Sequence, residues 1–468
     1  MFDIQIAGFL LDPARREPTL SHLVEKHLDI IIPDDHEEQK VVEAHFMPQL
    51  QEILTKKLKE EGLYDVYSTM EVPLSEVLSE IEITGIKIDT AYLKELSVEM
   101  TRDMHVLEKE IYKIADEEFN INSPKQLQVI LFEKLKLSSF KKTKTGFSTN
   151  VQVLTELAEV HPLPAKILEY RQFQKLLSTY VDVLPTLVDS ENRLHTTFRQ
   201  TIAATGRLSS SDPNLQNIPI RTDLGRKIRK AFIAKEGYKL LSADYSQIEL
   251  RMLAHFSGDP TLIEAFTESD TDIHSKTAAL IFSKTPEEVT SQERRIAKTV
   301  NFGVIYGMGP FKLSQDLKIS RKEASGFIER YFETYSKVDS FMKGLEANAK
   351  DIGCLQTLSG RKRYFPELKS SNRVLYEAAK REAINFPIQG SAADLIKIAM
   401  LNVAAELKKR KLSSRMVLQI HDELLVEVKE EEAKEVTHLL VEEMQNVLKL
   451  KVPLKVEAGI GDNWLDAH

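Results

Sequence analysis

Two aspartates stand at the ends of apolar runs that read as strands. Asp244 follows YKLLSA, and Asp422 lies in the turn of RMVLQIHDELLVEV, between His421 and Glu423. A lone aspartate at a strand end is most often a turn or cap residue. Two carboxylates on neighbouring strands have another use, because they can hold two divalent cations ~3.5–4 Å apart for an in-line phosphoryl displacement. Mg²⁺ suits such a site, since it takes few protein ligands and shares the phosphates of its substrate.

A second group of residues follows a step of four along RRIAKTVNFGVIYG (294–307). Arg294 and Lys298 share one face of a predicted helix, and Phe302 and Tyr306 continue the step. One side of this helix therefore presents two cations that can bind a triphosphate, followed by two aromatic rings that can stack on the sugar and base. The alternative is a solvated charged end followed by an aromatic end packed in the core.

Amide and arginine side chains form a third, scattered group. Such side chains donate to minor-groove acceptors, which every base pair offers in nearly the same place, so they can read duplex shape without reading sequence. For each residue taken singly, a turn or a structural ion pair remains the alternative. The group comprises Arg207, Asn214, Gln216, Asn217, Arg381, Asn385, Gln389 and Asp394.

The elements around these residues indicate an α+β chain. Helical spacing of apolar residues covers most of 71–190 and 260–375, and a turn-rich, β-like stretch lies between 190 and 221. Residues 415–428 form the clearest hairpin. We therefore expect helical blocks around a small antiparallel sheet.

Composition indicates a globular protein of about three domains. Hydrophobic residues make up 42% of the 468 residues, and the net charge of −8 counts mildly against nucleic-acid binding. Two stretches, 133–150 and 221–230, each carry five basic residues and one acidic residue, and such patches can grip phosphates. A single cysteine, Cys354, excludes an intrachain disulfide. No apolar run approaches the ~18 residues of a membrane span and no signal pattern is present, which favours a cytoplasmic location.

Three long motifs resemble those of family A DNA polymerases, in the right order and at the right spacing. They are DYSQIELRMLAH (244–255), RRIAKTVNFGVIYG (294–307) and QIHDELLVEV (419–428). Residues 205–221 and 385–394 resemble two further blocks of the family, and 119–135 and 141–150 look like the thumb of its bacterial members. The resemblance covers roughly residues 70–468 and is to the large (Klenow-type) fragment of bacterial DNA polymerase I.

The resemblance implies a right-hand polymerase fold, with an antiparallel sheet in the palm and helical fingers and thumb. The expected parts are a truncated remnant of a 3′–5′ exonuclease-like domain at 1–70, a thumb at 71–189, a palm at 190–250 and 376–468, and fingers at 251–375. It further implies a monomeric, nucleoid-associated DNA-directed DNA polymerase of replication and repair. Such an enzyme binds primed template DNA and extends the primer 3′ end with dNTPs, releases pyrophosphate, and uses two Mg²⁺ ions, for which Mn²⁺ can substitute.

Roles at the reaction centre follow from the resemblance residue by residue. Asp244 and Asp422 match the metal-binding and catalytic aspartates, the Tyr245 carbonyl is a further metal ligand, and Glu423 is a supporting carboxylate. The incoming dNTP is implied to be bound by His274, Arg294, Lys298, Phe302, Tyr306, Gln247 and Glu249. Within this set, Lys298 is also the acid for the leaving pyrophosphate, and Glu249 excludes a ribose 2′-hydroxyl. Phe302 lies against the incoming sugar and Tyr306 at the templating position.

Roles in DNA binding follow in the same way. Arg207 and Gln389 match minor-groove sensors at the primer end, and His421 lies against the primer terminus. The remaining DNA-binding residues implied by the resemblance are Asn214, Gln216, Asn217, Arg381, Asn385, Lys141, Lys142, Thr143 and Lys144.

The N-terminal segment departs from the family most. Asp3 matches one metal aspartate of the exonuclease domain, but the paired carboxylates that should precede it are missing, and Asp35-His36-Glu37 is interpreted as a solvated loop. We therefore expect no proofreading activity. Two alternatives stay open: a single-subunit RNA polymerase, which Glu249 argues against, and a non-catalytic duplex-binding protein, which Asp244, Lys298 and Asp422 together argue against.

Overall fold

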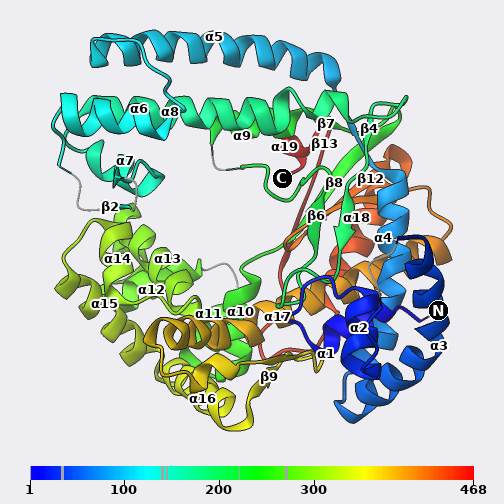
Figure 1. Ribbon diagram of the computed structural model, residues 1–468. Helices are drawn as coiled ribbons and strands as arrows, with labels where there is room; N and C mark the ends of the chain where they lie inside the picture. The colour runs from blue at the N-terminus through cyan, green and yellow to red at the C-terminus, as the bar shows by residue number, and fades with distance from the viewer. Residues whose placement is uncertain (1, 33–35, 139–141, 144–145, 221, 269–271) are drawn as a thin grey trace.

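A four-stranded antiparallel sheet lies at the centre of the chain, with strand order β11-β12-β8-β13 (Figure 1). The computed structural model describes residues 2–32, 36–138, 142–143, 146–220, 222–268 and 272–468, and for 36–43, 142–143 and 146 the backbone alone. The strands are β8 (Tyr238–Tyr245), β11 (Arg415–Ile420), β12 (Glu423–Lys429) and β13 (Val456–Gly461). The strand before Asp244 and the hairpin around Asp422 are thus confirmed.

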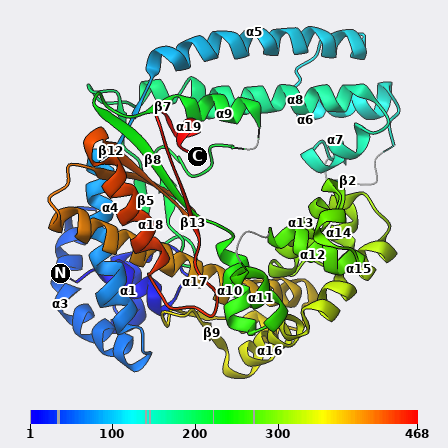
Figure 2. The same cartoon turned by 180° about the vertical axis from the view of Figure 1, so that it is seen from behind.

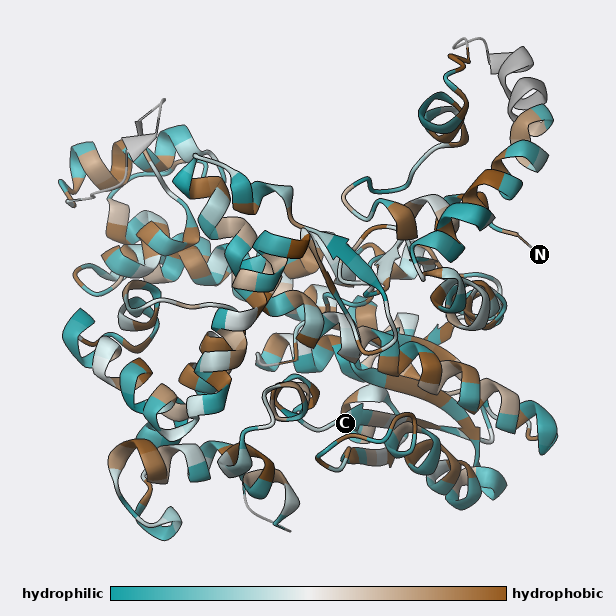
Figure 3. Ribbon diagram, turned by 90° about the horizontal axis from the view of Figure 1, so that it is seen from below, coloured by the Kyte–Doolittle hydropathy of each residue, from teal (hydrophilic) through white to brown (hydrophobic). Residues whose placement is uncertain are grey.

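The sheet is buried because helices pack on it. Most residues of β8, β11 and β12 are buried, and Figure 3 shows brown, apolar strands near the C-terminus. Helices α18 (Ala433–Gln445) and α19 (Trp464–Ala467) contact β8 and β13, while α4 (Val72–Thr84) contacts β11. The long helix α17 (Arg373–Lys409) contacts both α4 and α18, so it connects the helices that pack on the sheet.

Residues 90–176 form a long helical projection, which we call the arm. Its long helices α5 (Thr90–Ala115) and α8 (Pro162–Leu176) pack on each other, and with α6 (Pro124–Gln128) and α7 (Val151–Leu157) they enclose a small core. Asp89 caps α5 by accepting a hydrogen bond from the Tyr92 amide at 2.9 Å. A three-stranded sheet, β4-β1-β7, joins the arm to the rest of the chain; its strands are β1 (Ile86–Ile88), β4 (Arg193–Leu194) and β7 (Phe232–Ile233).

Residues 248–352 form the helical block. Helical spacing predicted helices over 260–375, which is wrong for the end of that range, because β9 (Cys354–Gln356) and β10 (Lys362–Tyr364) follow the last helix of the block. Its helices are α10 (Ile248–Ser257), α11 (Pro260–Thr267), α12 (Ile273–Phe282), α13 (Ser291–Ile305), α14 (Pro310–Leu317), α15 (Arg321–Thr334) and α16 (Ser336–Ile352). Figures 1 and 2 show the arm along the top of the molecule and the helical block below it, with the α7 end of the arm close to α14. At their far ends Lys318 of the helical block forms an exposed ion pair with Glu159 of the arm, at 2.5 Å.

The first 70 residues pack as a small helical unit with its own core. Helices α1 (Ile4–Leu11), α2 (Leu20–Leu28) and α3 (His36–Glu60) surround buried residues that contact Ile398 and Leu401 of α17. Asp3 caps α1, because its carboxylate accepts a hydrogen bond from the Ile6 amide at 2.8 Å. Asp35 lies outside the described residues. None of the helices in the described residues is long and apolar enough to cross a membrane.

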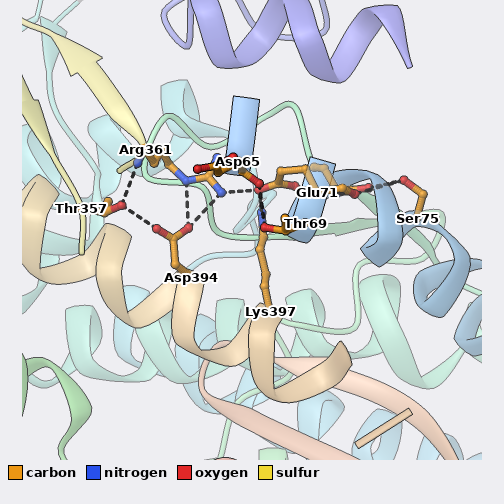
Figure 4. Close-up of polar contacts among 9 residues, drawn as sticks. Asp65, Thr69, Glu71, Ser75, Thr357, Arg361, Asp394 and Lys397 are labelled. Atoms are coloured by element: carbon orange, nitrogen blue, oxygen red, sulfur yellow. Dashed lines mark hydrogen bonds and ion pairs between the residues drawn. The ribbon is translucent and has the colours of Figure 1, made fainter. Parts of the chain in front are cut away.

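A buried network of four charged side chains joins three distant segments (Figure 4). Glu71 precedes α4, Arg361 lies between β9 (Cys354–Gln356) and β10 (Lys362–Tyr364), and Asp394 and Lys397 lie on α17. Lys397 donates to Glu71 at 2.6 Å, Arg361 donates to Asp394 at 2.9 Å and also to Glu71, and all four side chains are at most 3% exposed. Asp394 is therefore a structural ion-pair residue.

Candidate functional site

The two aspartates meet at one end of the central sheet. Asp244 is the penultimate residue of β8, and Asp422 lies in the turn between β11 and β12. Because β12 pairs antiparallel with β8, Glu423 lies opposite Asp244, and the Tyr245 amide donates to the Asp422 carbonyl at 3.3 Å. The pairing thus brings together two carboxylates that the sequence separates by 178 residues (422 − 244).

Both carboxylates are destabilised as anions where they stand. Burial, together with the charges of Asp422 and Glu423, raises the pKa of Asp244, and burial also raises the pKa of Asp422. The Asp244 Oδ1 atom is buried and has no hydrogen-bond partner among the described residues. A divalent cation would satisfy that oxygen and relieve the repulsion, so the pair fits the ions that the sequence predicts. Among the described residues, no group of three or more His, Cys, Asp or Glu is arranged to hold a metal ion.

Glu423 is held by the protein itself. It accepts hydrogen bonds from Ser242 at 2.7 Å and from the Trp464 indole at 2.8 Å, and His468 lies 3.6 Å away. Burial alone would raise the pKa of Glu423, but hydrogen bonds from His468, Ser242 and Trp464 lower it. Its carboxylate is therefore ionised and braces the strand beside Asp422.

Helices α12 and α13 present cationic groups on one surface. Arg294 and Lys298 lie one turn apart on α13; Arg294 forms an ion pair with Asp272, the N-cap of α12, at 2.8 Å, whereas Lys298 is exposed with no ion pair among the described residues. His274 lies on the facing α12. Burial lowers the pKa of His274 to about 4, with contributions from Lys298 and Arg294, so its ring is neutral at pH 7. The surface can therefore attract an anion and also offer it a neutral donor.

The two predicted rings have different surroundings. Phe302 packs against His274, with ring centroids 5.6 Å apart. Helix α13 ends at Ile305, so Tyr306 is its C-cap rather than a helical residue. The Tyr306 hydroxyl donates to the buried Glu249 at 2.9 Å, and Arg207 donates to the same carboxylate at 2.7 Å. Glu249 thus links a residue of the second group to one of the third.

Three predicted site residues lie within three positions of the aspartates along the chain. The Tyr245 ring is buried and its hydroxyl donates to the Met444 carbonyl at 2.7 Å. Gln247 caps α10 in a left-handed conformation, with φ of 56°. His421 begins the hairpin turn with φ of 55°, and its ring is exposed. The backbone around both aspartates is therefore fixed by strand pairing and tight turns.

The third group divides into an α17 face and a loop. Arg381, Asn385 and Gln389 recur every four residues on α17, so they share one face of that helix. Asn385 Oδ1 is buried without a hydrogen-bond partner among the described residues, and Gln389 is 8% exposed. The buried Asn385 oxygen thus lacks the hydrogen bond that such groups usually make.

In the loop, Asn214 and Gln216 already have internal partners. The Asn214 side chain accepts from the Gln216 amide at 3.1 Å, which is the predicted turn chemistry. The Gln216 side chain donates to that of Gln419 at 3.0 Å and is 9% exposed, so it braces β11. Asn214 and Asn217 line a cavity of about 560 Å³ whose other wall, including Lys175, belongs to the arm.

The basic stretches are only partly open to a ligand. Lys141 and Lys144 lie outside the described residues, and Lys142 and Thr143 form the short strand β2 (Lys142–Thr143). In 221–230, Arg229 is buried over the Trp464 ring, with its Cζ 3.8 Å from the ring centroid. Lys227 pairs with Glu99 of the arm at 2.6 Å. Arg229 and Lys227 therefore make contacts within the protein that stabilise the fold.

Sequence reasoning missed Asn301, a polar residue in the core of the helical block. It is fully buried on α13, and its amide lies 3.1 Å from the His274 ring. The sequence pattern could have revealed its burial, because Asn301 shares a helix face with the apolar residues Ala297, Val300 and Val304. A polar side chain on a buried helix face needs a hydrogen-bond partner.

Comparison with known proteins places these residues in a family. Residues 90–466 match the model of DNA polymerase family A. DNA polymerase I of Caldicellulosiruptor bescii is 47% identical over 465 residues, which cover 99% of this chain and 55% of that protein. DNA polymerase I of Bacillus subtilis is 44% identical over 485 residues, covering 100% of this chain and 55% of that protein. The chain thus spans about half the length of the curated relatives it matches.

A solved structure gives the same result for the fold. The POL domain of Pol1 from M. smegmatis, in complex with DNA primer-template and dNTP, superposes with a TM-score of 0.95 at 43% identity. The match covers 99% of this chain and 82% of that one. An overlay this complete extends to every element that carries a candidate site residue.

Proposed function

The chain belongs to DNA polymerase family A, and from this premise we propose that it extends the 3′ end of a primer on template DNA, adding dNTPs and releasing pyrophosphate. The fold is the right-hand polymerase fold. We assign the palm to 190–250 and 376–468, because β8 from the first part and β11–β13 from the second form one sheet. The arm then lies within the thumb (71–189), and residues 1–70 are the exonuclease-like remnant. The helical block belongs to the fingers (251–375) except for its first three residues, 248–250, which belong to the palm.

The observation that carries the proposal is the carboxylate pair. Family A DNA polymerases are metal-dependent, and we assign the two ions, as Mg²⁺, to Asp244, Asp422 and the Tyr245 carbonyl. When bound, such ions activate the attacking hydroxyl and neutralise charge on the phosphoryl oxygens. The buried, unpartnered Asp244 Oδ1 and the raised pKa values of both aspartates support this assignment. Glu423 keeps the strand end in place through its own hydrogen bonds.

The surface of α12 and α13 is our proposed triphosphate site. Lys298 is exposed and lacks an ion pair among the described residues, so it is free to bind the triphosphate and to give a proton to the leaving pyrophosphate. Arg294 would exchange or share its ion pair with Asp272 when an anion arrives. His274 is neutral and adds a hydrogen-bond donor without adding charge.

Selection of the sugar is assigned to Glu249 and Phe302. Glu249 is buried and held by hydrogen bonds from Tyr306 and Arg207, so it cannot swing aside without breaking both. A carboxylate fixed in this way leaves no room for a 2′-hydroxyl, which argues for deoxynucleotides as substrates and against an RNA polymerase. Phe302 packs against His274 and is only partly buried, so we assign the exposed part of its ring to the sugar contact.

Primed template DNA is proposed to lie between the arm and the helical block, over the palm. Asn217 and Arg381 are exposed there, and two cavities of about 560 and 770 Å³ run along the arm with Lys175 in the lining of both. Residues that donate to minor-groove acceptors beside basic groove walls suit a duplex read by shape.

The proposal is tested by primer extension with Mg²⁺ and dNTPs. Asp244→Ala and Asp422→Ala should each abolish extension, while their affinity for primed DNA, measured by fluorescence anisotropy, stays within about twofold of wild type because phosphate contacts dominate that affinity. Asp462→Ala is a matched control, since Asp462 pairs with Lys239 at the opposite end of the same sheet. Retention of more than a few per cent of the wild-type rate by either site variant would refute the assignment.

A further inference from the structure

A chain of buried polar side chains lies behind the proposed triphosphate surface. His274 and Thr277 lie on α12, Asn301 on α13, and Tyr335 precedes α16. His274 is 3% exposed and the other three are fully buried. Neighbouring members are 3.1 Å apart, from the Tyr335 hydroxyl to Thr277 Oγ1, from Thr277 Oγ1 to Asn301 Nδ2, and from Asn301 Nδ2 to His274 Nδ1. In such a chain each group donates to one neighbour and accepts from the next. Once the position of one hydroxyl proton is known, the direction of the other hydrogen bonds follows.

The Thr277 hydroxyl supplies that proton. It has a single hydrogen, and its shortest acceptor is the Ile273 carbonyl at 2.8 Å. With its proton donated there, Thr277 Oγ1 accepts from both the Tyr335 hydroxyl and the Asn301 amide. The Asn301 –NH₂ group therefore lies between Thr277 and His274, and its second hydrogen points to His274 Nδ1.

Both atoms of the Asn301 amide lie near Thr277 Oγ1, with Nδ2 at 3.1 Å and Oδ1 at 3.3 Å. In the orientation that the structure records, Nδ2 is the nearer atom and also the one that faces His274 Nδ1. Nδ2 therefore has two acceptors, Thr277 Oγ1 and His274 Nδ1.

We propose that Asn301 is a positioning residue for nucleotide binding, which holds His274 in the tautomer that carries its proton on Nε2. Nδ1 accepts from Asn301, so the single proton of the neutral ring must lie on Nε2. The ring makes no second hydrogen bond among the residues that the structure describes, so Nε2–H remains free for a triphosphate oxygen. The opposite tautomer would present a lone pair to that anion. This inference rests on the proposed function, in which His274 contacts the triphosphate.

The tautomer can be read directly by NMR on the full chain without DNA or nucleotide. Protonated and unprotonated imidazole nitrogens give well-separated ¹⁵N signals, and a ¹⁵N-histidine sample with a His274→Gln spectrum for assignment identifies His274 among the 12 histidines. We expect an unprotonated Nδ1 and a protonated Nε2 near pH 8. A protonated Nδ1 in the wild-type chain would overturn the inference, whatever the variants do.

Two variants test whether Asn301 sets the tautomer. Asn301→Asp replaces the amide donor with an acceptor of the same shape, and it should move a proton onto His274 Nδ1. Tyr335→Phe removes the hydroxyl at the far end of the same buried chain, and it should leave the His274 signals unchanged. An unprotonated Nδ1 in Asn301→Asp would show that Asn301 does not control the ring.

Nucleotide binding gives the second readout. At pH 9, where the ring of Asn301→Asp is neutral, its KM for dNTP should rise about tenfold or more, the loss of one hydrogen bond to a charged group, with kcat changed less. Tyr335→Phe should keep the wild-type KM. An unchanged KM with a switched tautomer would overturn the role in nucleotide binding. Absence of any extension by the wild-type chain would instead overturn the proposed function and leave the tautomer assignment standing.

Discussion

Replacing Lys397 with methionine should destabilise the palm strongly, because it unbalances the buried network of Figure 4. The network holds two positive and two negative side chains, each at most 3% exposed. Methionine keeps the length and apolar stem of lysine, but it leaves Glu71 and Asp394 facing Arg361 alone. Removing one side of a buried ion pair costs about 3–5 kcal/mol, since the remaining charge is uncompensated. Adding Glu71→Gln restores neutrality, so the double variant should lose no more stability than either single variant.

The free energy of unfolding can be followed in urea through Trp464, the single tryptophan, which is fully buried in the palm. Lys409→Met on the same helix is the control, because Lys409 pairs with Glu406 at the surface and should matter by less than about 1 kcal/mol. The expected coupling energy between Lys397 and Glu71 is about 3 kcal/mol. Our reasoning is wrong if Lys397→Met loses no more than Lys409→Met, or if the losses of the two single variants add in the double variant.

Four further predictions concern substrates and conditions. Glu249→Ala should lower the ratio of dNTP to rNTP efficiency at least about tenfold in single-nucleotide extension, since the buried carboxylate no longer fills the space of a 2′-hydroxyl; an unchanged ratio would mean that another group guards that position. Phe302→Tyr should lower the ratio of dNTP to ddNTP incorporation efficiency from above ~100 toward unity, because the added hydroxyl replaces the missing 3′-hydroxyl of the ddNTP. An equal loss of efficiency for both substrates would show that Phe302 does not contact the sugar. The pKa of Glu71 is lowered from 4.5 to about 2 against burial by Lys397 and Arg361, so the unfolded chain binds the proton first and stability should fall as the pH drops from about 5 toward 2; in Glu71→Gln the urea midpoint should fall less over this range, and the remaining fall belongs to other carboxylates with lowered pKa values, such as Asp272. A 3′-mismatched primer incubated with Mg²⁺ and no dNTP should keep its length, because the one matching exonuclease aspartate, Asp3, caps a helix, and shortening would contradict this.

Local patterns predicted the elements well, because they depend on neighbouring residues. An apolar run located β8 and alternation located the hairpin of β11 and β12, while helical spacing located α4, α5 and most helices of the helical block. The end of α13 was misjudged by one residue, since Tyr306 continues the step of four but is the C-cap, followed by Gly307 with φ of 63°. A left-handed glycine ends a helix whatever pattern precedes it.

The buried polar contacts could not be predicted, because they depend on which distant segments meet. Glu71 and Arg361 are separated by 290 positions, and in the sequence each resembles an ordinary surface charge. Similarly, nothing local distinguishes Asp272, which pairs with Arg294, from any other helix cap. The adjacency of Asp244 and Asp422 was expected only because both stood at strand ends, and the register of β8 against β12 decided it.

The exposed ion pair between Lys318 and Glu159 has a consequence for how DNA would be loaded on the proposed function. With side chains 68% and 55% exposed, such a pair contributes at most about 1 kcal/mol and is screened by salt. No helix of the arm packs broadly on a helix of the helical block among the described elements. Separating the two ends is therefore easy at physiological ionic strength. On the proposed function, a duplex would then enter sideways rather than being threaded from a terminus, and we expect a nick or gap within a closed circle to be as accessible as a primer near a free end.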